Sequence, residues 1–137
     1  MKPYTRKINY YECDRMGITH HSNYIRFMEE ARIYYLEQLG YGFEKLEEQG
    51  IVSPVLSLTV NYKRQTTFPD VIQIELGVEK LSSLKITFSY TMSSKGETVC
   101  TATSTHCFMK NGEPVIMEQE FPQLYEAMCT LKNNSNR

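Results

Sequence analysis

The sequence predicts an α+β fold in which an antiparallel sheet of about five strands wraps around one long helix. One long segment, residues 22–40, carries apolar side chains at helical spacing. Beyond residue 55, apolar and polar side chains alternate in successive segments joined by connections of turn length. Strands joined in this way lie antiparallel, and their apolar face needs a cover. The long helix is the element that can supply it.

Composition is typical of an ordinary globular domain. The chain has 137 residues, of which 41% are hydrophobic and 23% charged, with a net charge of −1 at pH 7. The hydrophobic content is too high for a disordered chain, and the mixture of apolar and charged residues is not that of a membrane protein. The near-neutral balance provides no broad basic field, so we expect neither nucleic acid nor an anionic membrane as the main partner. We assign residues 1–131 to one domain and the polar residues 132–137 to a frayed tail.

Cysteine spacing and the lengths of apolar segments indicate the cellular compartment in which the protein is expected. Cys13, Cys100, Cys107 and Cys129 form no C-x-x-C pair, so their spacing carries no zinc or redox signature. The first residues lack the apolar core of a signal peptide, and we find no apolar run of about 18 residues. We therefore expect a cytoplasmic protein with reduced thiols and no membrane span.

The first half of the chain is predicted to hold one strand and the long helix. An aromatic-rich strand is expected at residues 4–13, followed by a loop that contains Gly17. Ser22 is a residue type that caps helices, and Gly40 is a typical helix stop. The expected apolar face of the helix consists of Tyr24, Phe27, Met28, Ala31, Tyr35 and Leu39, broadened by Ile25, Ile33 and Leu36. A stripe this wide indicates a largely buried helix.

The second half is predicted to be mainly strands. A short acidic helix is expected at residues 44–50. Period-two alternation then predicts strands at 56–62, 72–78 and 86–92, and a β-branched run predicts another at 97–109. A short helix is expected at residues 121–131.

The densest polar cluster, residues 11–24, lies where the first strand gives way to the helix. The first turn of a helix presents backbone N–H groups without helical partners, which can receive an oxyanion. A nearby carboxylate can act as nucleophile or general base. Asp14 and His21 are seven residues apart, and Gly17 allows the loop between them to fold back. On spacing alone, an Asp in such a loop is more often a turn former.

The run YECDRMGITHHSNYIRFMEEAR, residues 11–32, resembles the signature of the 4-hydroxybenzoyl-CoA thioesterase-like family of hotdog-fold acyl-CoA thioesterases. The matching positions are Asp14, Gly17, Ile18, His21, Asn23, Tyr24, Glu29, Ala31 and Arg32. Residues 50–62 and 68–76 also resemble the second and third strands of that family. The resemblance implies a hotdog fold and hydrolysis of an acyl-CoA thioester. It implies no cofactor, because coenzyme A is part of the substrate.

The resemblance also implies catalytic roles for Asp14 and His21. Asp14 either attacks the thioester carbonyl, which gives a mixed anhydride, or activates a water molecule, and the sequence leaves both open. The backbone N–H of His21 is expected to face the thioester oxygen at the helix start. The His21 side chain either orients Asp14 or a water, or protonates the departing thiolate. Cys13 stands where many relatives have Thr, and we interpret it as a packing residue.

Substrate contacts are predicted at Gly17, Tyr24, Ser53, Lys63, Ser82, Ser83 and Lys85. The resemblance places Ser53 near the acyl group and the turn containing Ser82, Ser83 and Lys85 near the phosphates of coenzyme A, although relatives have a more basic turn there. Lys63 and Arg64 form a second basic pair. Each assignment has a structural alternative, because Ser53 can simply enter a strand and Lys63 can be a solvated strand end.

Two other kinds of site are disfavoured. Adjacent histidines point apart on regular structure, so Asp14, His20, His21 and His106 offer no metal-ligand spacing, and we expect no metal. Glu29 and Glu30 lie on the long helix, where another hotdog branch carries its catalytic carboxylate. We interpret them as surface pairs of Glu29 with Arg32 and of Arg26 with Glu30.

Three alternative functions remain. The protein could cleave acyl-carrier-protein thioesters, or it could be a non-catalytic subunit that binds acyl groups. A hotdog hydratase is disfavoured because the Gly-Asp-x-Asn-Pro-type motif is missing. The resemblance implies a dimer with joined sheets and shared active sites, often paired into a tetramer. The 10 tyrosines and 6 phenylalanines suit an acyl pocket or a subunit seam, but the acyl group itself is left open.

Overall fold

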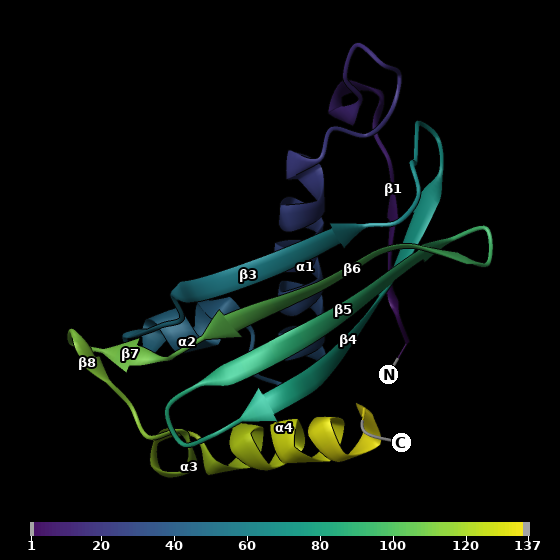
Figure 1. Cartoon of the computed structure of the whole chain (residues 1–137). Coiled ribbons are helices and arrows are strands. Elements are labelled where there is room, and N and C mark those ends of the chain that lie inside the picture. Colours follow the sequence, from purple (N-terminus) through teal and green to yellow (C-terminus); the bar gives the residue numbers. More distant parts are fainter. Residues whose placement is uncertain (1, 136–137) are drawn as a thin grey trace.

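The computed structural model describes residues 2–135, and its centre is a five-stranded antiparallel sheet that curves around one helix. The strands are β1 (Tyr4–Lys7), β3 (Val55–Tyr62), β4 (Val71–Leu81), β5 (Ile86–Ser94) and β6 (Glu97–His106). They pair in the order β1-β4-β5-β6-β3, and every neighbouring pair is antiparallel. The covering helix is α1 (Ser22–Gln38) (Figure 1). The predicted fold class is therefore confirmed.

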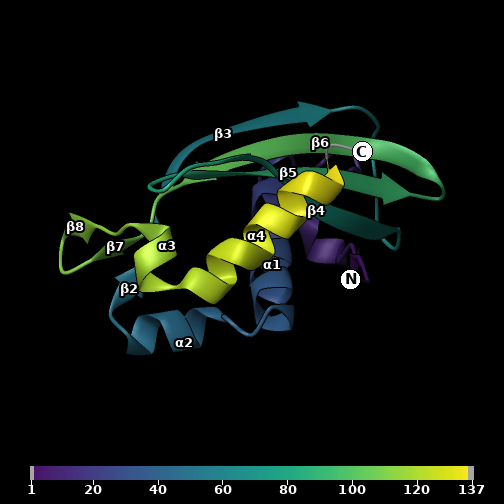
Figure 2. The ribbon, with the colours of Figure 1, turned by 90° about the horizontal axis from the view of Figure 1, so that it is seen from below.

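Smaller elements surround this centre: η1 (Tyr10–Glu12), α2 (Phe43–Glu48), β2 (Ile51–Val52), β7 (Met109–Lys110), β8 (Glu113–Pro114), α3 (Met117–Glu120) and α4 (Pro122–Ser135). Strands β2, β7 and β8 form a small second sheet that the sequence did not predict. Helix α4 lies on the same side of the sheet as α1 (Figure 2). It continues through residues 132–135, which the sequence assigned to the tail, whereas residues 136–137 lie outside the described residues.

The first strand is shorter than the expected range of 4–13. Strand β1 ends at Lys7, and the chain turns into η1 because the Glu12 carboxylate folds back to the Asn9 amide at 2.7 Å. The same carboxylate is bound by the Arg6 guanidinium. Burial raises the pKa of Glu12, but its hydrogen bonds with Arg6 and the Asn9 amide outweigh burial, so the pKa lies below its ordinary value. An ionised, buried Glu12 thus anchors the segment that precedes Asp14.

The two ends of α1 differ in how well the sequence predicted them. Ser22 is already helical and does not cap the helix; instead, the His20 ring accepts the Ser22 N–H at 3.2 Å. At the other end, Gly40 adopts a φ of +85°, and its amide bonds to the Glu37 carbonyl at 3.0 Å. The Tyr41 amide bonds to the Leu36 carbonyl at 2.9 Å, which completes a Schellman motif. The predicted stop at Gly40 is confirmed.

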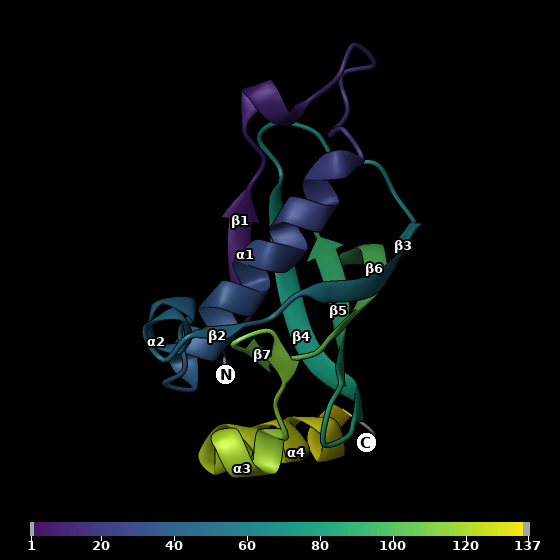
Figure 3. The same ribbon diagram turned by 90° about the vertical axis from the view of Figure 1, so that its left-hand side faces the viewer.

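The core forms where α1 packs across the concave face of the sheet (Figure 3). The alternating residues of β5 are buried as predicted, and so are Ile72, Ile74 and Val78 of β4. Ile25 is an exception on the helix, since it is 41% exposed. In the described part of the chain, no helix is both long and apolar enough to cross a membrane.

Candidate active site

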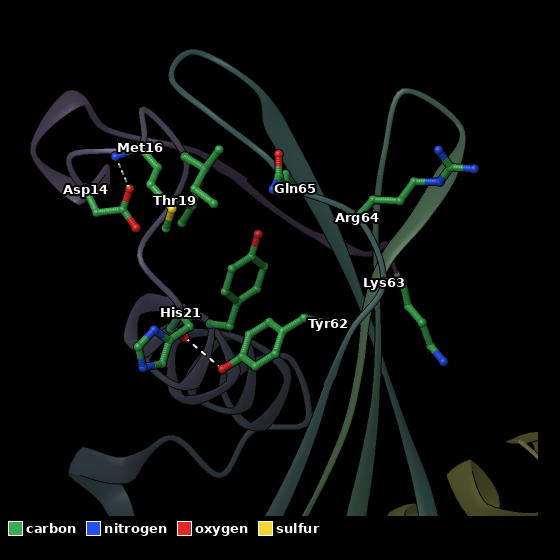
Figure 4. A pocket seen from close by; sticks show the side chains of 10 residues that line it. Asp14, Met16, Thr19, His21, Tyr62, Lys63, Arg64 and Gln65 are labelled. Atoms are coloured by element: carbon green, nitrogen blue, oxygen red, sulfur yellow. Dashed lines mark hydrogen bonds between the residues drawn. The ribbon is translucent and has the colours of Figure 1, made fainter.

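A cavity of about 320 Å³ opens at the N-terminal end of α1 (Figure 4). Three segments form its wall: the loop before α1, the first turn of α1, and the end of β3 with the residues that follow. The lining residues are Asp14, Met16, Ile18, Thr19, His21, Tyr24, Tyr62, Lys63, Arg64 and Gln65. The structure thus brings Asp14, His21, Tyr24 and Lys63, all predicted from the sequence, to one cavity.

The Asp14 side chain is held at one oxygen only. Its Oδ1 accepts the Met16 N–H at 2.8 Å, and Gly17, with a φ of +79°, lets the chain turn back so that the Asp14 amide reaches the Ile18 carbonyl at 2.9 Å. No hydrogen bond to Asp14 Oδ2 is present in residues 2–135. The turn-forming role expected for an Asp in this loop is therefore real, and it leaves a second carboxylate oxygen available for chemistry.

His21 lies directly before α1, and the two polar groups of its backbone differ in their hydrogen bonding. Its carbonyl accepts the Tyr62 hydroxyl at 3.0 Å and the Tyr24 amide at 3.3 Å. Its own N–H donates no hydrogen bond within the described part of the chain. An unpaired amide at a helix N-terminus, where the helix dipole is positive, can bind an oxyanion. The His21 ring stacks on the exposed His20 ring, with 4.3 Å between centroids.

Buried hydroxyl groups form hydrogen bonds with residues that line the cavity. The Thr66 hydroxyl lies 2.7 Å from both the Tyr24 and the Thr19 hydroxyls, and the Thr19 amide donates to the Thr66 carbonyl at 2.9 Å. The sequence did not predict a site role for Thr66 or Tyr62. Tyr62 was interpreted as one of the alternating strand residues, and Thr66 lies in a connection without a motif. No signal in the sequence alone distinguishes either residue.

Two cations stand at the rim of the cavity. Arg64 is paired with Glu97 at 3.1 Å, and both side chains are exposed. Lys63 is exposed and forms no ion pair among residues 2–135. At the rim, Arg64 is thus already paired with a carboxylate, whereas Lys63 is available to bind an anionic ligand.

Comparisons with known proteins identify the family. Residues 8–124 match the model of the Thioesterase-like superfamily. The chain belongs to this superfamily. It is 37% identical to a putative esterase of Aquifex aeolicus over 85% of this chain and 91% of that protein. It is 29% identical to the putative acyl-CoA thioesterase YneP of Bacillus subtilis over 88% of this chain and 90% of that protein.

Solved structures agree with this assignment. The DHNA-CoA thioesterase from Staphylococcus aureus superposes with a TM-score of 0.91 at 32% identity, covering 99% of this chain and 95% of that one. A hypothetical protein from Aquifex aeolicus superposes with a TM-score of 0.85 at 35% identity, covering 89% and 97%. The sheet wrapped around α1 is therefore the hotdog fold of thioesterases, as the sequence resemblance implied.

The remaining predicted residues lie outside the cavity of this thioesterase-like chain. Gly17 faces a second, neighbouring cleft of about 270 Å³ that Asp14 also lines. Ser53 borders a cavity of about 190 Å³ between α2 and β2. Ser82 and Lys85 bond to each other's backbone in the turn between β4 and β5, and the Ser83 hydroxyl donates to Glu118 at 2.7 Å. This turn lies at the opposite end of the sheet from the Asp14 loop (Figure 1).

The acidic residues of α1 are paired differently from the expectation. Glu30 binds Arg6 at 3.1 Å and the Tyr4 hydroxyl at 2.9 Å rather than Arg26. Arg32 is buried and donates to the Tyr90 hydroxyl at 3.0 Å rather than to Glu29. Both expected surface pairs are wrong, because strand β1 and the core offer closer partners than the helix surface does.

No group of three or more His, Cys, Asp or Glu side chains within residues 2–135 is arranged to hold a metal ion.

Proposed function

We propose that this protein hydrolyses the thioester of an acyl-coenzyme A to a free acid and coenzyme A. One observation carries the proposal: Asp14, whose carboxylate has one oxygen without a partner in residues 2–135, and His21, whose amide has none there, line the same cavity at the start of a helix. Membership of the Thioesterase-like superfamily supports it. So does its similarity to a putative acyl-CoA thioesterase of Bacillus subtilis and to the DHNA-CoA thioesterase of Staphylococcus aureus.

The two groups divide the reaction between them. When an oxygen nucleophile adds to the thioester carbon, negative charge develops on the carbonyl oxygen, and the His21 amide at the helix N-terminus stabilises it. The nucleophile is either Asp14 Oδ2 itself or a water whose proton Asp14 accepts. The carbon–sulfur bond then breaks, and the coenzyme A thiolate leaves and takes up a proton. If Asp14 itself attacks, a water molecule then hydrolyses the acyl–Asp14 anhydride, which releases the acid and restores the carboxylate. On either route one water is consumed for each acyl-CoA cleaved, so the reaction needs no cofactor.

Replacing Asp14 by Asn tests the proposal. The carboxamide keeps the size of the side chain and an oxygen for the Met16 amide, but it can neither accept a proton nor attack efficiently. We expect kcat for acyl-CoA hydrolysis to fall by about 100-fold or more, with acyl-CoA binding retained. Thiol release in a colorimetric assay measures the rate, and calorimetry measures binding. Unchanged hydrolysis in the Asp14→Asn variant would contradict the mechanism.

The positive charge at the rim of the cavity favours a coenzyme A thioester over a carrier-protein thioester as the substrate. Lys63 is an uncommitted cation beside the cavity and suits a phosphate of coenzyme A. The predicted contacts of Ser82, Ser83 and Lys85 with phosphate stay predictions, and the Glu118 carboxylate beside Ser83 disfavours an anion there. Parallel assays with matched CoA and carrier-protein thioesters separate the two substrates; turnover of the carrier form alone would contradict the proposal.

We also propose that two copies pair through β3. This eight-residue strand is an edge of the sheet, and its Val55, Leu56 and Leu58 are at least 40% exposed. An edge strand with exposed apolar residues offers unpaired backbone groups and apolar surface to another strand, which favours pairing. Antiparallel pairing of β3 with itself brings the start of one strand opposite the end of the other. Ser53 of the partner subunit would then approach Tyr62 and the Asp14 cavity, as its predicted acyl contact requires.

Further association of dimers into a tetramer stays a prediction from the family resemblance. We place the enzyme in the cytoplasm, where its four unpaired cysteines would remain reduced. The acyl group is best identified by measuring hydrolysis across acyl-CoAs that differ in chain length and in aromatic rings.

A further inference from the structure

Tyr62 ends strand β3 and lies against the first turn of α1, on the wall of the candidate active site (Figure 4). Its hydroxyl donates to the His21 carbonyl at 3.0 Å. Its ring makes edge-to-face contacts with the rings of Tyr24 and His21, with centroids 5.4 Å and 6.3 Å away. These contacts are formed between segments 41 residues apart in the chain, so they join the edge strand to the helix start.

The acceptor of this hydrogen bond belongs to His21, a residue that lines the cavity and whose amide has no hydrogen-bond partner within residues 2–135. The N–H and C=O of His21 flank a single Cα, so their directions are related through the φ and ψ of that residue. His21 has a φ of −56° and a ψ of −30°. A donor that holds the carbonyl therefore also restricts where the amide points. Oxyanion donors act only when they are held within a few tenths of an ångström and about 10–20° of the productive geometry.

The hydroxyl is in the correct state to act as this donor. Burial raises the pKa of Tyr62 above its ordinary value, so the phenol stays protonated at neutral pH. The exposed His21 side chain has no hydrogen-bond partner within residues 2–135 that could hold its backbone instead. The His20 carbonyl, which shares a peptide group with the His21 N–H, accepts the Asn23 amide at 3.0 Å. The next peptide group, which contains the His21 carbonyl, is held from outside the helix by Tyr62.

We propose that Tyr62 is a positioning residue for catalysis, which aligns the oxyanion-binding amide of His21 by holding the carbonyl of the same residue. The proposal rests on the proposed thioesterase function and deepens it. It assigns to Tyr62 no direct contact with the reacting atoms. Its effect passes through the orientation of His21 and appears in the rate of the chemical step rather than in substrate binding.

The test is Tyr62→Phe, which removes the hydroxyl and retains the ring that lines the cavity. We expect kcat to fall by about 3- to 10-fold, the value of one hydrogen bond, with KM within about twofold of wild type. Tyr41→Phe is the matched control, because the Tyr41 hydroxyl also makes one bond, to Gln123 at 3.2 Å, beyond the other end of α1. An unchanged kcat in Tyr62→Phe, or an equal fall in Tyr41→Phe, would overturn the proposal.

A second measurement is independent of turnover. The His21 carbonyl shares a peptide group with the Ser22 amide, so loss of the hydrogen bond should shift the amide resonances of both residues in ¹H–¹⁵N spectra. Tyr41→Phe should leave these two resonances in place. If Tyr62→Phe also leaves them in place, the hydroxyl does not hold this peptide and the proposal fails. If the wild-type chain hydrolyses no acyl-CoA, the proposed function fails, and the catalytic role of Tyr62 fails with it, whatever the spectra show.

Discussion

Thr66 connects two segments of the candidate active site through one buried hydroxyl group. The Thr66 residue is 3% exposed, and its oxygen lies 2.7 Å from the hydroxyls of Tyr24 on α1 and Thr19 in the Asp14 loop. Burial raises the pKa of Tyr24, so its phenol remains a protonated hydrogen-bond donor at neutral pH. This set of hydroxyls holds the loop, the helix and the β3–β4 connection together beneath the cavity.

Replacing Thr66 by Val keeps the shape of the side chain and removes the shared oxygen. We expect the free energy of unfolding to fall by about 1–3 kcal/mol, because two buried hydroxyls lose a partner. Denaturation in urea measures the change. Thr91→Val, at an exposed position of β5, is the control and should stay within about 0.5 kcal/mol of wild type. Equal stability of the Thr66 and Thr91 variants would contradict the role given to Thr66.

At the scale of elements, strand β3 differs most from its expected environment. Leu56, Leu58, Val60 and Tyr62 alternate with polar residues as core strand residues do, and the sequence predicts one buried face. In the single chain, Leu56, Leu58 and Tyr62 are exposed, because β3 is the last strand of the sheet and α1 covers the strands nearer to β4. The proposed pairing of two copies through β3 would cover this exposed apolar face and account for the pattern.

Replacing Leu58 by Lys tests this interpretation of β3. In an antiparallel pair, the new charge lies close to the same charge on the partner strand, and like charges in an interface cost several kcal/mol. We expect the dissociation constant of the dimer to rise by at least about 100-fold. Light scattering during size-exclusion chromatography measures the mass. Leu84→Lys is the control, because Leu84 is 45% exposed in the β4–β5 turn. A wild-type chain that is monomeric, or an unchanged dimer in Leu58→Lys, would contradict the pairing.

At the scale of the whole molecule, a buried polar chain crosses the core between α1 and the sheet. Arg32 donates to Tyr90, whose hydroxyl lies 2.6 Å from the Ser104 hydroxyl, which in turn lies 2.7 Å from Nε2 of His106. Burial lowers the pKa of His106 to about 4, and the Arg32 charge acts in the same direction. In the neutral tautomer that leaves Nε2 unprotonated, His106 accepts a hydrogen bond from the Ser104 hydroxyl, and every member of the chain then has a partner.

The depressed pKa of His106 predicts a loss of stability in acid. Between an unfolded pKa near 6.5 and a folded pKa of about 4, the unfolded chain binds a proton that the folded chain does not. The free energy of unfolding should therefore fall as the pH drops through this window, by up to about 1.4 kcal/mol per pH unit from this residue. Urea denaturation at several pH values measures the slope, and His106→Gln should reduce it. An equal slope in the Gln variant would contradict the assignment.

Local patterns predicted much of this architecture and part of the site. The helical stripe of α1, the Gly40 stop and the strands β4 and β5 follow from side-chain periodicity and backbone conformation, which act over a few residues. Asp14 and His21 lie in one loop that ends where α1 begins, so their joint presence at the helix start could also be predicted locally. The early end of β1 could not, because it depends on where Arg6 and Glu12 meet.

Local sequence patterns were enough to predict the sheet-around-helix class, the order of the long helix and the main strands, and the placement of a carboxylate beside a helix N-terminus. Tertiary contacts were needed to show that Tyr62 and Thr66 join this site and that β3 is an exposed edge. They also show that Ser53 and the Ser82–Lys85 turn lie away from the site within one chain (Figure 1). The difference arises from how far apart in the sequence the interacting residues lie. Periodicity and capping are decided by neighbours along the chain, whereas these contacts depend on strand order and register, which are set by the burial of the whole core.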